Sequence, residues 1–207
     1  MIIVHHLNDS RSQRVLWLLE ELDLPYEIRQ YQRDEKTRLA PPELKAVHPL
    51  GKSPVLEDDG RIVIESGAIV DYLVRQHGNG RFEPKRGTDE FEAYNQWLHY
   101  AEGSAMLPLM LRLYVGRLGE EAGAPLKPRI DSEIANHLGY VDQALKGREW
   151  LVGNELTGAD IQMSFVGEAA RGARAEYPNM NAWVQRFQAR PAYQRALKRG
   201  GPYAFAA

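Results

Sequence analysis

The hydrophobic pattern of the chain changes once, between residues 78 and 88, and this change constrains the fold more than any other feature. Before it, short β-prone segments alternate with segments of helical periodicity, whereas after it the chain is helical to its end. The intervening Gly-Asn-Gly-Arg-Phe-Glu-Pro-Lys-Arg-Gly segment has no periodicity, which is typical of a linker. The sequence therefore predicts a small α/β domain over 1–78, a linker over 79–88 and an all-α domain over 89–207.

The first domain is expected to follow the order β-α-β-α-β-β-α. Strands are predicted at 2–6 and 26–31, with a helix between them that ends before Pro25. A short helix over 41–47 precedes a hairpin over 54–65, whose Asp59-Gly60 pair is a strong turn signal. A helix over 66–77 completes the domain.

Capping residues mark the helices of the second domain. Thr88 is predicted to cap a long helix that reaches about residue 115 and is kinked at Pro108. Thr157 and Asp160 have the spacing of a capping box, which predicts another helix start.

The sequence of 207 residues contains no cysteine. This excludes a disulfide scaffold, a thiolate zinc site, an Fe–S cluster, a cysteine nucleophile and a C-x-x-C redox pair. Any sulfur chemistry must therefore use a thiol that a ligand brings in. The 6 histidines show no zinc-ligand spacing, so no metal site is predicted.

The charge balance and the lack of long apolar stretches argue against several kinds of partner. The chain has 26 Lys and Arg against 28 Asp and Glu, and this net charge of -2 argues against binding to nucleic acid or anionic lipid through bulk charge. No stretch approaches the roughly 20 apolar residues of a membrane-spanning helix, and the first residues lack the basic and apolar regions of a signal peptide. We therefore expect a cytoplasmic protein with no nucleic-acid and no membrane partner.

Three segments of the first domain carry polar side chains where a charged or extended ligand could bind. The first segment connects the first strand to the first helix, and the N–H groups at a helix N-terminus stabilise an anion. Ser10 could donate its hydroxyl proton to such an anion. The alternative is structural, because Ser10 or Ser12 could simply be the N-cap of the helix.

The second and third segments fit an extended ligand with a charged group at its end. Pro54 begins a strand, and a cis bond before it would turn the backbone of Ser53 toward a ligand, although a trans bond is the commoner state. Ser66 lies at another helix N-terminus, where it could bind a carboxylate, and Glu65 beside it could pair with an amine. An α-amino acid head group needs this pair of contacts, but an N-cap role explains Ser66 equally well.

Together these segments resemble the glutathione S-transferases. The resemblance is carried by the Asn8-x-Ser10-Arg11 opening with its helix to residue 22, by residues 25–27, 48–56 and 65–73, and by the 156–161 capping motif. It covers essentially the whole chain, and the opening is most similar to a bacterial and fungal branch of the family with a serine-like site. The resemblance implies an α/β thioredoxin-like N-terminal domain, an all-α C-terminal helical domain, a homodimer and a transferase of the detoxification type.

The resemblance also assigns a glutathione site to the first domain. It implies that the backbone of Ser53, before a cis proline, pairs with the cysteinyl part of glutathione. It further implies that Glu65 and Ser66 hold the γ-glutamyl amine and carboxylate, and that Lys52 faces the glycyl carboxylate. Glutathione is then a co-substrate, and no cofactor is expected. The residues expected to bind glutathione are His48, Lys52, Ser53, Pro54, Glu65 and Ser66.

The resemblance implies a catalytic side chain near the end of the first strand that stabilises the glutathione thiolate. Family members use a Tyr, Ser or Cys there, and this segment has no Tyr. Ser10 matches the serine type best. Asn8, Arg11 and Ser12 remain alternatives, because spacing alone does not fix which side chain points at the sulfur.

The electrophile is expected to bind against the long helix of the second domain, on an apolar face with a few hydroxyls. The predicted function is the transfer of glutathione thiolate to a small hydrophobic electrophile. A glutathione-dependent peroxidase or isomerase on the same site is one alternative, and a non-catalytic ligand-binding or protein-interaction module is another. The residues expected in the electrophile pocket, for which core or dimer contacts are the alternative role, are Tyr100, Ser104, Leu107, Pro108, Leu111 and Tyr114.

Overall fold

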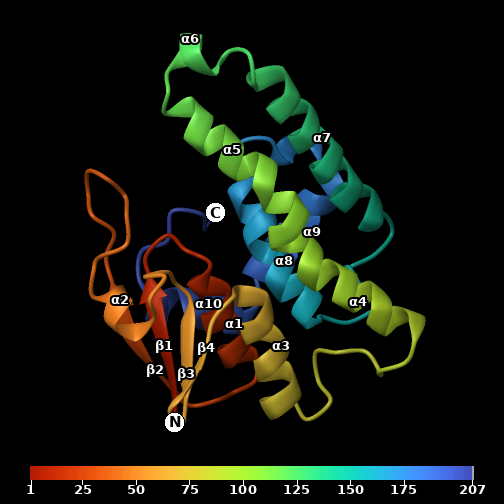
Figure 1. Ribbon diagram of the computed structural model, residues 1–207. Helices are drawn as coiled ribbons and strands as arrows, with labels where there is room; N and C mark the ends of the chain where they lie inside the picture. The colour runs from red at the N-terminus through yellow and green to blue at the C-terminus, as the bar shows by residue number, and fades with distance from the viewer. Residues whose placement is uncertain (207) are drawn as a thin grey trace. The chain divides into compact units, whose positions relative to one another are not determined.

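The computed structural model describes residues 1–206, which form two compact units (Figure 1). The first unit combines residues Met1–Glu83 with the end of the chain from Arg186 onward. The second unit spans Pro84–Gln185.

A four-stranded mixed sheet lies at the centre of the first unit. Its strands are β1 (Ile2–Leu7), β2 (Tyr26–Tyr31), β3 (Val55–Asp58) and β4 (Arg61–Val63), in the spatial order β2-β1-β3-β4. β1 runs parallel to β2, whereas β3 is antiparallel to both β1 and β4. All residues of β1 are buried, which accounts for its continuous apolar start.

The predicted order β-α-β-α-β-β-α is confirmed, with α1 (Ser12–Glu21), α2 (Leu44–Val47) and α3 (Ser66–His77) as its helices. Two boundaries differ from the expectation. α2 begins at Leu44 because the residues before it form a tighter turn, in which the Leu44 N–H donates to the Pro41 carbonyl at 3.3 Å. β4 ends early because Glu65 leaves the extended conformation, with φ at 65°.

The core of the first unit lies around α1, all of whose residues are buried. Trp17 stacks on Phe187 with ring centroids 5.2 Å apart and meets Tyr193 edge-on at 5.5 Å. Tyr193 belongs to α10 (Pro191–Gly200), so the end of the chain packs on α1. The contacts therefore group the end of the chain with the first unit, whereas the domain boundaries expected from the sequence assigned every residue after 88 to the helical domain. α10 packs on the first unit because it has an amphipathic face, whose buried residues are Ala192, Tyr193, Ala196 and Gly200.

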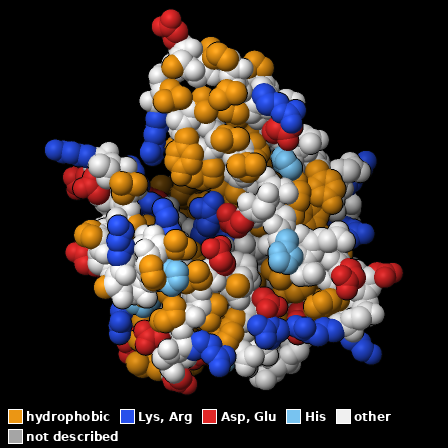
Figure 2. Space-filling model, viewed as in Figure 1, with side chains coloured by type: hydrophobic (Ala, Val, Ile, Leu, Met, Phe, Trp, Pro, Cys, Tyr) orange, Lys and Arg blue, Asp and Glu red, His pale blue; other side chains and the backbone are white. Residues whose placement is uncertain are grey.

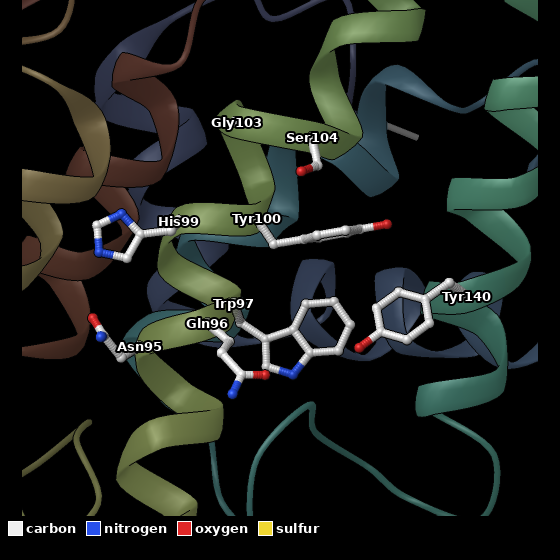
Figure 3. Close-up of a pocket in the computed structure, with 8 residues that line it drawn as sticks. All are labelled: Asn95, Gln96, Trp97, His99, Tyr100, Gly103, Ser104 and Tyr140. Carbon is white, nitrogen blue, oxygen red and sulfur yellow. The ribbon is translucent and has the colours of Figure 1, made fainter.

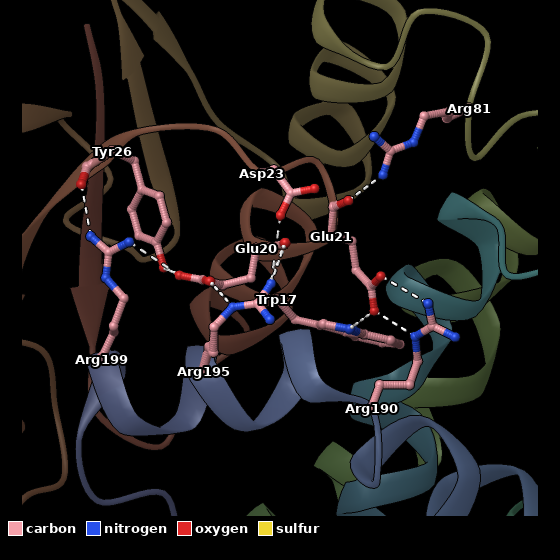
Figure 4. Close-up of polar contacts among 9 residues, drawn as sticks. All are labelled: Trp17, Glu20, Glu21, Asp23, Tyr26, Arg81, Arg190, Arg195 and Arg199. Carbon is pink, nitrogen blue, oxygen red and sulfur yellow. Dashed lines mark hydrogen bonds and ion pairs between the residues drawn. The ribbon is translucent and has the colours of Figure 1, made fainter.

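Ion pairs fix α10 on α1 (Figure 4). Arg195 Nε lies 2.7 Å from Glu20 Oε2, and Arg199 Nη1 lies 3.1 Å from Glu20 Oε1. Arg190, just before α10, donates to Glu21 Oε2 at 2.9 Å. Both glutamates are buried, and a buried carboxylate requires such partners.

The second unit is helical, and the two predicted caps are confirmed. The Thr88 hydroxyl accepts from the Phe91 N–H at 3.3 Å, and Thr157 and Asp160 form a capping box. The helices of this unit, the last of which runs into the first unit, are α4 (Asp89–Tyr100), α5 (Met106–Gly116), α6 (Glu120–Gly123), α7 (Lys127–Ala144), α8 (Gly158–Ala169) and α9 (Pro178–Gln188).

The expected long helix from residue 88 is interrupted before Pro108 rather than at it. A π-helical turn, Ala101–Ala105, separates α4 from α5, and Pro108 lies in the first turn of α5. The proline ring would clash with the carbonyl of residue 104 in a continuous α-helix, and proline has no N–H to donate to it. The wider turn relieves this conflict, so the irregularity lies in the residues that precede the proline.

None of the helices within residues 1–206 combines the length and apolar character that crossing a membrane requires. The mixed sheet with its helices, followed by a helical unit, agrees with the fold class expected from the sequence.

Candidate functional site

The loop from β1 to α1 places Ser10 and Ser12 in a buried hydrogen-bond network. Ser10 is 4% exposed, and its Oγ lies 2.7 Å from Ser12 Oγ. Ser10 Oγ also accepts from the backbone N–H of Ser12, the first residue of α1, at 3.2 Å. The N-cap residue of α1 is Arg11, whose side chain makes no capping hydrogen bond, and Ser10 instead accepts from the first N–H of the helix. The Ser10 hydroxyl therefore lies at the N-terminus of a helix, where an anion is stabilised.

His6 extends this network toward the end of the chain. Its Nδ1 lies 2.8 Å from Ser12 Oγ, and its ring donates to the backbone carbonyl of Gly200. Burial lowers the pKa of His6, and the hydrogen bond to Gly200 only partly opposes this shift. The imidazole is therefore neutral at pH 7.

Two arginines, Arg33 and Arg38, donate hydrogen bonds to the same loop. The backbone N–H of Arg33 donates to Asn8 Oδ1 at 2.8 Å, and Arg33 Nε donates to the Asn8 carbonyl at 3.1 Å. The Asp9 carboxylate accepts from Arg38 and from the backbone N–H of Ala204, each at 2.8 Å. Asn8 and Arg11 are both half-buried. These contacts hold the loop in one conformation, with Asp9 in the left-handed region at φ 49°.

The segment before β3 joins this loop at the end of β1. The Ser53–Pro54 peptide bond is cis, as expected from the resemblance. The Ser53 hydroxyl donates to the His5 carbonyl at 2.8 Å and accepts from the Leu7 N–H at 3.2 Å. Within residues 1–206, the Ser53 amide and carbonyl form no backbone–backbone hydrogen bond, so the main chain there is open to an extended ligand.

The start of α3 lies beside α1. Arg14, buried in α1, has its Nη1 3.4 Å from Ser66 Oγ. Ser66 is 4% exposed and is the first residue of α3, whereas Glu65 before it is exposed. The first N–H groups of a helix have no partner within it, so this N-terminus can receive a carboxylate.

Hydrogen bonds within the first unit therefore connect two of the predicted ligand-binding segments to the elements on either side of the Ser10 loop. Ser53 is bonded to Leu7 at the end of β1, and Ser66 to Arg14 in α1. Lys52 is exposed and His48 is half-buried in the turn that precedes Ser53. The His48 ring nitrogen Nδ1 accepts from the Leu50 N–H at 3.4 Å, which leaves the opposite side of the ring available.

The second unit contains an open pocket of about 570 Å³ (Figure 3). Two of the predicted electrophile residues, Tyr100 and Ser104, lie in it. The Tyr100 hydroxyl lies 2.6 Å from His137 Nδ1, and burial raises the pKa of Tyr100 to about 12, with Tyr140 adding to the shift. The residues that line the pocket are Asn95, Gln96, Trp97, His99, Tyr100, Gly103, Ser104 and Tyr140.

The other four predicted electrophile residues do not line this pocket. Pro108 is buried, while Leu107, Leu111 and Tyr114 are exposed on α5 by 56%, 40% and 55%. Figure 2 shows hydrophobic side chains gathered on the face over α5. α5 thus presents an apolar surface, and the binding of an electrophile to it stays a prediction.

Sequence reasoning missed two aromatic residues of the pocket. Trp97 stacks on Tyr140 with ring centroids 5.3 Å apart. Trp97 lies three residues before Tyr100 and seven before Ser104, so helical spacing could have identified it. Tyr140 comes from α7, and only the packing of α7 brings it there.

No group of His, Asp and Glu side chains within residues 1–206 is arranged to hold a metal ion. The fold and the site define a class of protein. It has a thioredoxin-like α/β unit with a cis-proline before β3 and polar helix N-termini at α1 and α3, and a helical unit beside these in the sequence.

Comparison with known proteins identifies the family. Residues 1–75 match the glutathione S-transferase N-terminal domain, and residues 104–191 match the glutathione S-transferase C-terminal domain. Glutathione S-transferase 3 of Schizosaccharomyces pombe is 34% identical, over 96% of this chain and 88% of the relative. Glutathione S-transferase 1 of Saccharomyces cerevisiae is also 34% identical, over 93% and 92% of the two chains.

A solved structure agrees with these matches. A glutathione S-transferase from Actinobacillus pleuropneumoniae has a TM-score of 0.89 and 35% identity, covering 99% of this chain and 95% of that one. The chain belongs to the glutathione S-transferase family. The expected fold class and the expected enzyme class are both confirmed.

Proposed function

We propose that this protein activates the thiol of glutathione and transfers the thiolate to a small hydrophobic electrophile. The observation that carries the proposal is the junction at the end of β1. There the Leu7 N–H donates to the Ser53 hydroxyl at 3.2 Å, which places Ser53 beside the last residue before the Ser10 loop. Within residues 1–206, the main chain of Ser53 makes no backbone–backbone hydrogen bond. A main chain free to pair with a peptide lies next to a helix N-terminus that stabilises an anion.

Glutathione is the co-substrate in this proposal. The Ser53 backbone pairs with its cysteinyl part, and the N-terminus of α3 with Ser66 receives the γ-glutamyl carboxylate. Glu65 pairs with the amine, and Lys52, with His48 near it, faces the glycyl carboxylate. Two proteins with similar folds support this ligand. Phanerochaete chrysosporium Ure2p8 was solved with oxidized glutathione, and Ure2p with glutathione.

Thiolate formation needs only modest stabilisation. A free thiol has a pKa of about 8.5, so only about 3% is ionised at pH 7. Lowering this pKa by about 2 units requires roughly 2.7 kcal/mol, which one hydroxyl donor and a helix N-terminus together can supply. We assign the donor role to Ser10, as in the serine type of the family, with Asn8, Arg11 and Ser12 as the competing candidates.

The electrophile then binds against the second unit, at Tyr100 and Ser104 and along the apolar face of Leu107, Leu111 and Tyr114, which lie on either side of the buried Pro108 in the sequence. With an aromatic halide, the sulfur forms a bond to the ring carbon, the carbon–halogen bond breaks, and the halide leaves. The thiol proton has already passed to solvent. Ure2p5 of Phanerochaete chrysosporium, crystallised with 1-(S-glutathionyl)-2,4-dinitrobenzene, holds the product of such a reaction.

The proposal is tested by glutathione binding and by conjugation. We expect retention on immobilised glutathione and thermal stabilisation by glutathione. We also expect conjugation of 1-chloro-2,4-dinitrobenzene, measured from the absorbance of the conjugate. Retention without conjugation but with hydroperoxide reduction or isomerisation would favour the alternative reactions of the same site. No retention and no stabilisation would contradict the transferase, peroxidase and isomerase functions alike and would favour a ligand-binding or interaction module.

The role of Ser10 has its own test. Bound glutathione should show thiolate absorbance with a pKa well below that of the free thiol, and Ser10→Ala should raise that pKa by about 1 to 2 units. An unchanged thiol pKa in this variant would move the role to Asn8, Arg11 or Ser12.

We also propose that the protein is a cytoplasmic homodimer, as the family resemblance implies. Light scattering coupled to size exclusion measures the mass directly. A mass near twice the 23.5 kDa of the chain is expected, and a mass of one chain would contradict the proposal.

A further inference from the structure

Four polar groups form a buried chain from the end of α10 to the proposed thiolate donor. The Gly200 carbonyl accepts from the His6 ring, His6 Nδ1 lies 2.8 Å from Ser12 Oγ, and Ser12 Oγ lies 2.7 Å from Ser10 Oγ. His6 is 3% exposed, Ser10 4% and Ser12 0%. Every proton in this chain must therefore be assigned to a partner within it or to a ligand.

The tautomer of His6 sets the direction of the chain. A backbone carbonyl only accepts, so the ring nitrogen that meets Gly200 carries the proton, and this is Nε2, because Nδ1 faces Ser12. In a neutral imidazole Nδ1 is then an acceptor, and Ser12 donates to it. The Leu7 carbonyl also lies near Ser12 Oγ, but at 3.3 Å it is the longer and weaker acceptor.

This direction determines what the hydroxyl of Ser10 does. Two hydroxyl oxygens 2.7 Å apart require one of them to donate. Ser12 has one hydroxyl proton, which it donates in the hydrogen bond to His6 Nδ1. Ser10 is therefore the donor between the two serines, and its proton points at Ser12. Without a ligand, the Ser10 proton is therefore directed inward, away from any anion at the helix N-terminus.

We propose that His6 is a positioning residue that acts through Ser12 and sets the direction in which the Ser10 hydroxyl donates its proton. Glutathione sulfur and Ser12 compete for this single proton, so the relay moderates how strongly the site stabilises the thiolate. This inference rests on the proposed function, in which Ser10 is the thiolate donor. The relay also ties that donor to the C-terminal end of α10.

Packing holds His6 in the orientation that the relay needs. A Cβ atom on Gly200 would lie 3.3 Å from His6 Nε2 and 2.8 Å from Gln13 Oε1. Glycine at position 200 therefore allows the backbone to approach the imidazole closely. Because the ring has a partner on both sides, a 180° flip would put a carbon atom in place of each nitrogen and would lose both hydrogen bonds.

The relay makes a prediction that opposes the simple loss of a hydrogen bond. Ser12→Ala removes the acceptor that competes for the Ser10 proton, while the Ser12 backbone N–H still donates to Ser10 Oγ. The thiol pKa of bound glutathione, read from thiolate absorbance across a pH series, should fall by about half to one unit, the size of one neutral hydrogen bond. Ser10→Ala should shift the same pKa in the opposite direction.

Ser164→Ala is the matched control. Ser164 is also a buried helical serine, and its hydroxyl donates to the Ile161 carbonyl at 2.8 Å within the second unit. This variant should leave the thiol pKa unchanged. A thiol pKa in Ser12→Ala that is equal to or above that of the unmodified protein would overturn the relay.

A spectroscopic measurement keeps the inference testable if Ser12→Ala does not fold. The ¹⁵N shifts of His6 in the unmodified protein, recorded by long-range ¹H–¹⁵N correlation, should show a protonated Nε2 and an unprotonated Nδ1. A protonated Nδ1 would reverse the chain and overturn the inference. Absence of glutathione binding by the unmodified protein contradicts the proposed function and with it this role, whereas a bound thiolate that does not respond to Ser12→Ala contradicts the relay alone.

Discussion

Glu65 occupies a backbone conformation that few side chains adopt, with φ 65° and ψ 115°. Such a conformation costs about 1–3 kcal/mol for a residue with a Cβ atom, and glycine reaches it at a lower cost. Glycine also loses more entropy on folding, roughly 0.5–1 kcal/mol. We therefore expect Glu65→Gly to raise the free energy of unfolding in urea by about 1 kcal/mol, and to weaken glutathione binding about tenfold.

Glu65→Gln separates the two effects. Glutamine keeps the strained backbone and removes the charge proposed to pair with the γ-glutamyl amine. The free energy of unfolding should then stay unchanged, while calorimetry shows a similar loss of glutathione affinity. If the Gly variant is no more stable than the Gln variant, the backbone at residue 65 is not strained.

Tyr100 is a predicted electrophile residue that also lines the pocket of the second unit, where it carries a hydroxyl group. Because burial raises its pKa to about 12, the phenol stays protonated up to about pH 11, and the rate should show no alkaline limb from this residue. Tyr100→Phe should change the KM for the electrophile several-fold and leave the thiol pKa of bound glutathione unchanged. A shifted thiol pKa would instead place the hydroxyl at the sulfur.

At the scale of the element, the start of α8 depends on one buried carboxylate. Asp160 accepts from the N–H groups of Leu151 and Thr157 at 2.9 Å and 3.0 Å, from the Thr157 hydroxyl, and from Trp183 Nε1 at 3.0 Å. Asn at position 160 would turn one acceptor oxygen into a donor that faces two other donors. Asp160→Asn should therefore lower the free energy of unfolding by about 2–4 kcal/mol.

Thr157→Ser is the matched control for this prediction. Serine keeps the hydroxyl and the cap, so urea unfolding should shift by less than about 1 kcal/mol. Asp160→Asn with a shift as small as that of the control would show that the four donors are satisfied without the carboxylate.

The elements show which boundaries can be predicted from sequence. The starts of α4 and α8 were predictable because a cap is a local contact, between Thr88 and Phe91 or between Thr157 and Asp160. The π-helical turn was not, because Pro108 signals an irregularity but does not fix which turn absorbs it. Its place depends on how α4 and α5 bury Trp97, Met106 and their neighbours.

At the scale of the whole molecule, the last residues of the chain complete the first unit through Glu20. Arg195, the Tyr26 hydroxyl and Arg199 donate to its carboxylate at 2.7, 2.8 and 3.1 Å. Burial alone would raise the pKa of Glu20, but these hydrogen bonds outweigh it and hold the pKa below 4.5. A lowered carboxyl pKa contributes stability above the unfolded value and loses it as the pH falls through the folded value.

This sign predicts how Glu20→Gln depends on pH. The difference in the free energy of unfolding between the unmodified protein and Glu20→Gln should be largest near pH 7, on the order of 1–3 kcal/mol. It should shrink steadily below about pH 4.5, as urea titrations at several pH values would measure. A difference that does not vary with pH would show that Glu20 acts through packing rather than through its charge.

The sequence by itself determined the order of the elements, the caps of α4 and α8 and the segments that bear the proposed glutathione site. Hydrophobic period, turn residues and capping residues act over a few positions, and the motifs at Ser10, Ser53 and Ser66 carry a family resemblance. Only the tertiary structure decided that α10 packs on α1, that Tyr140 contacts Trp97, and that Ser10, Ser12 and His6 form a chain that ends at Gly200. These contacts join residues far apart in the sequence, and the packing of whole helices and strands fixes them.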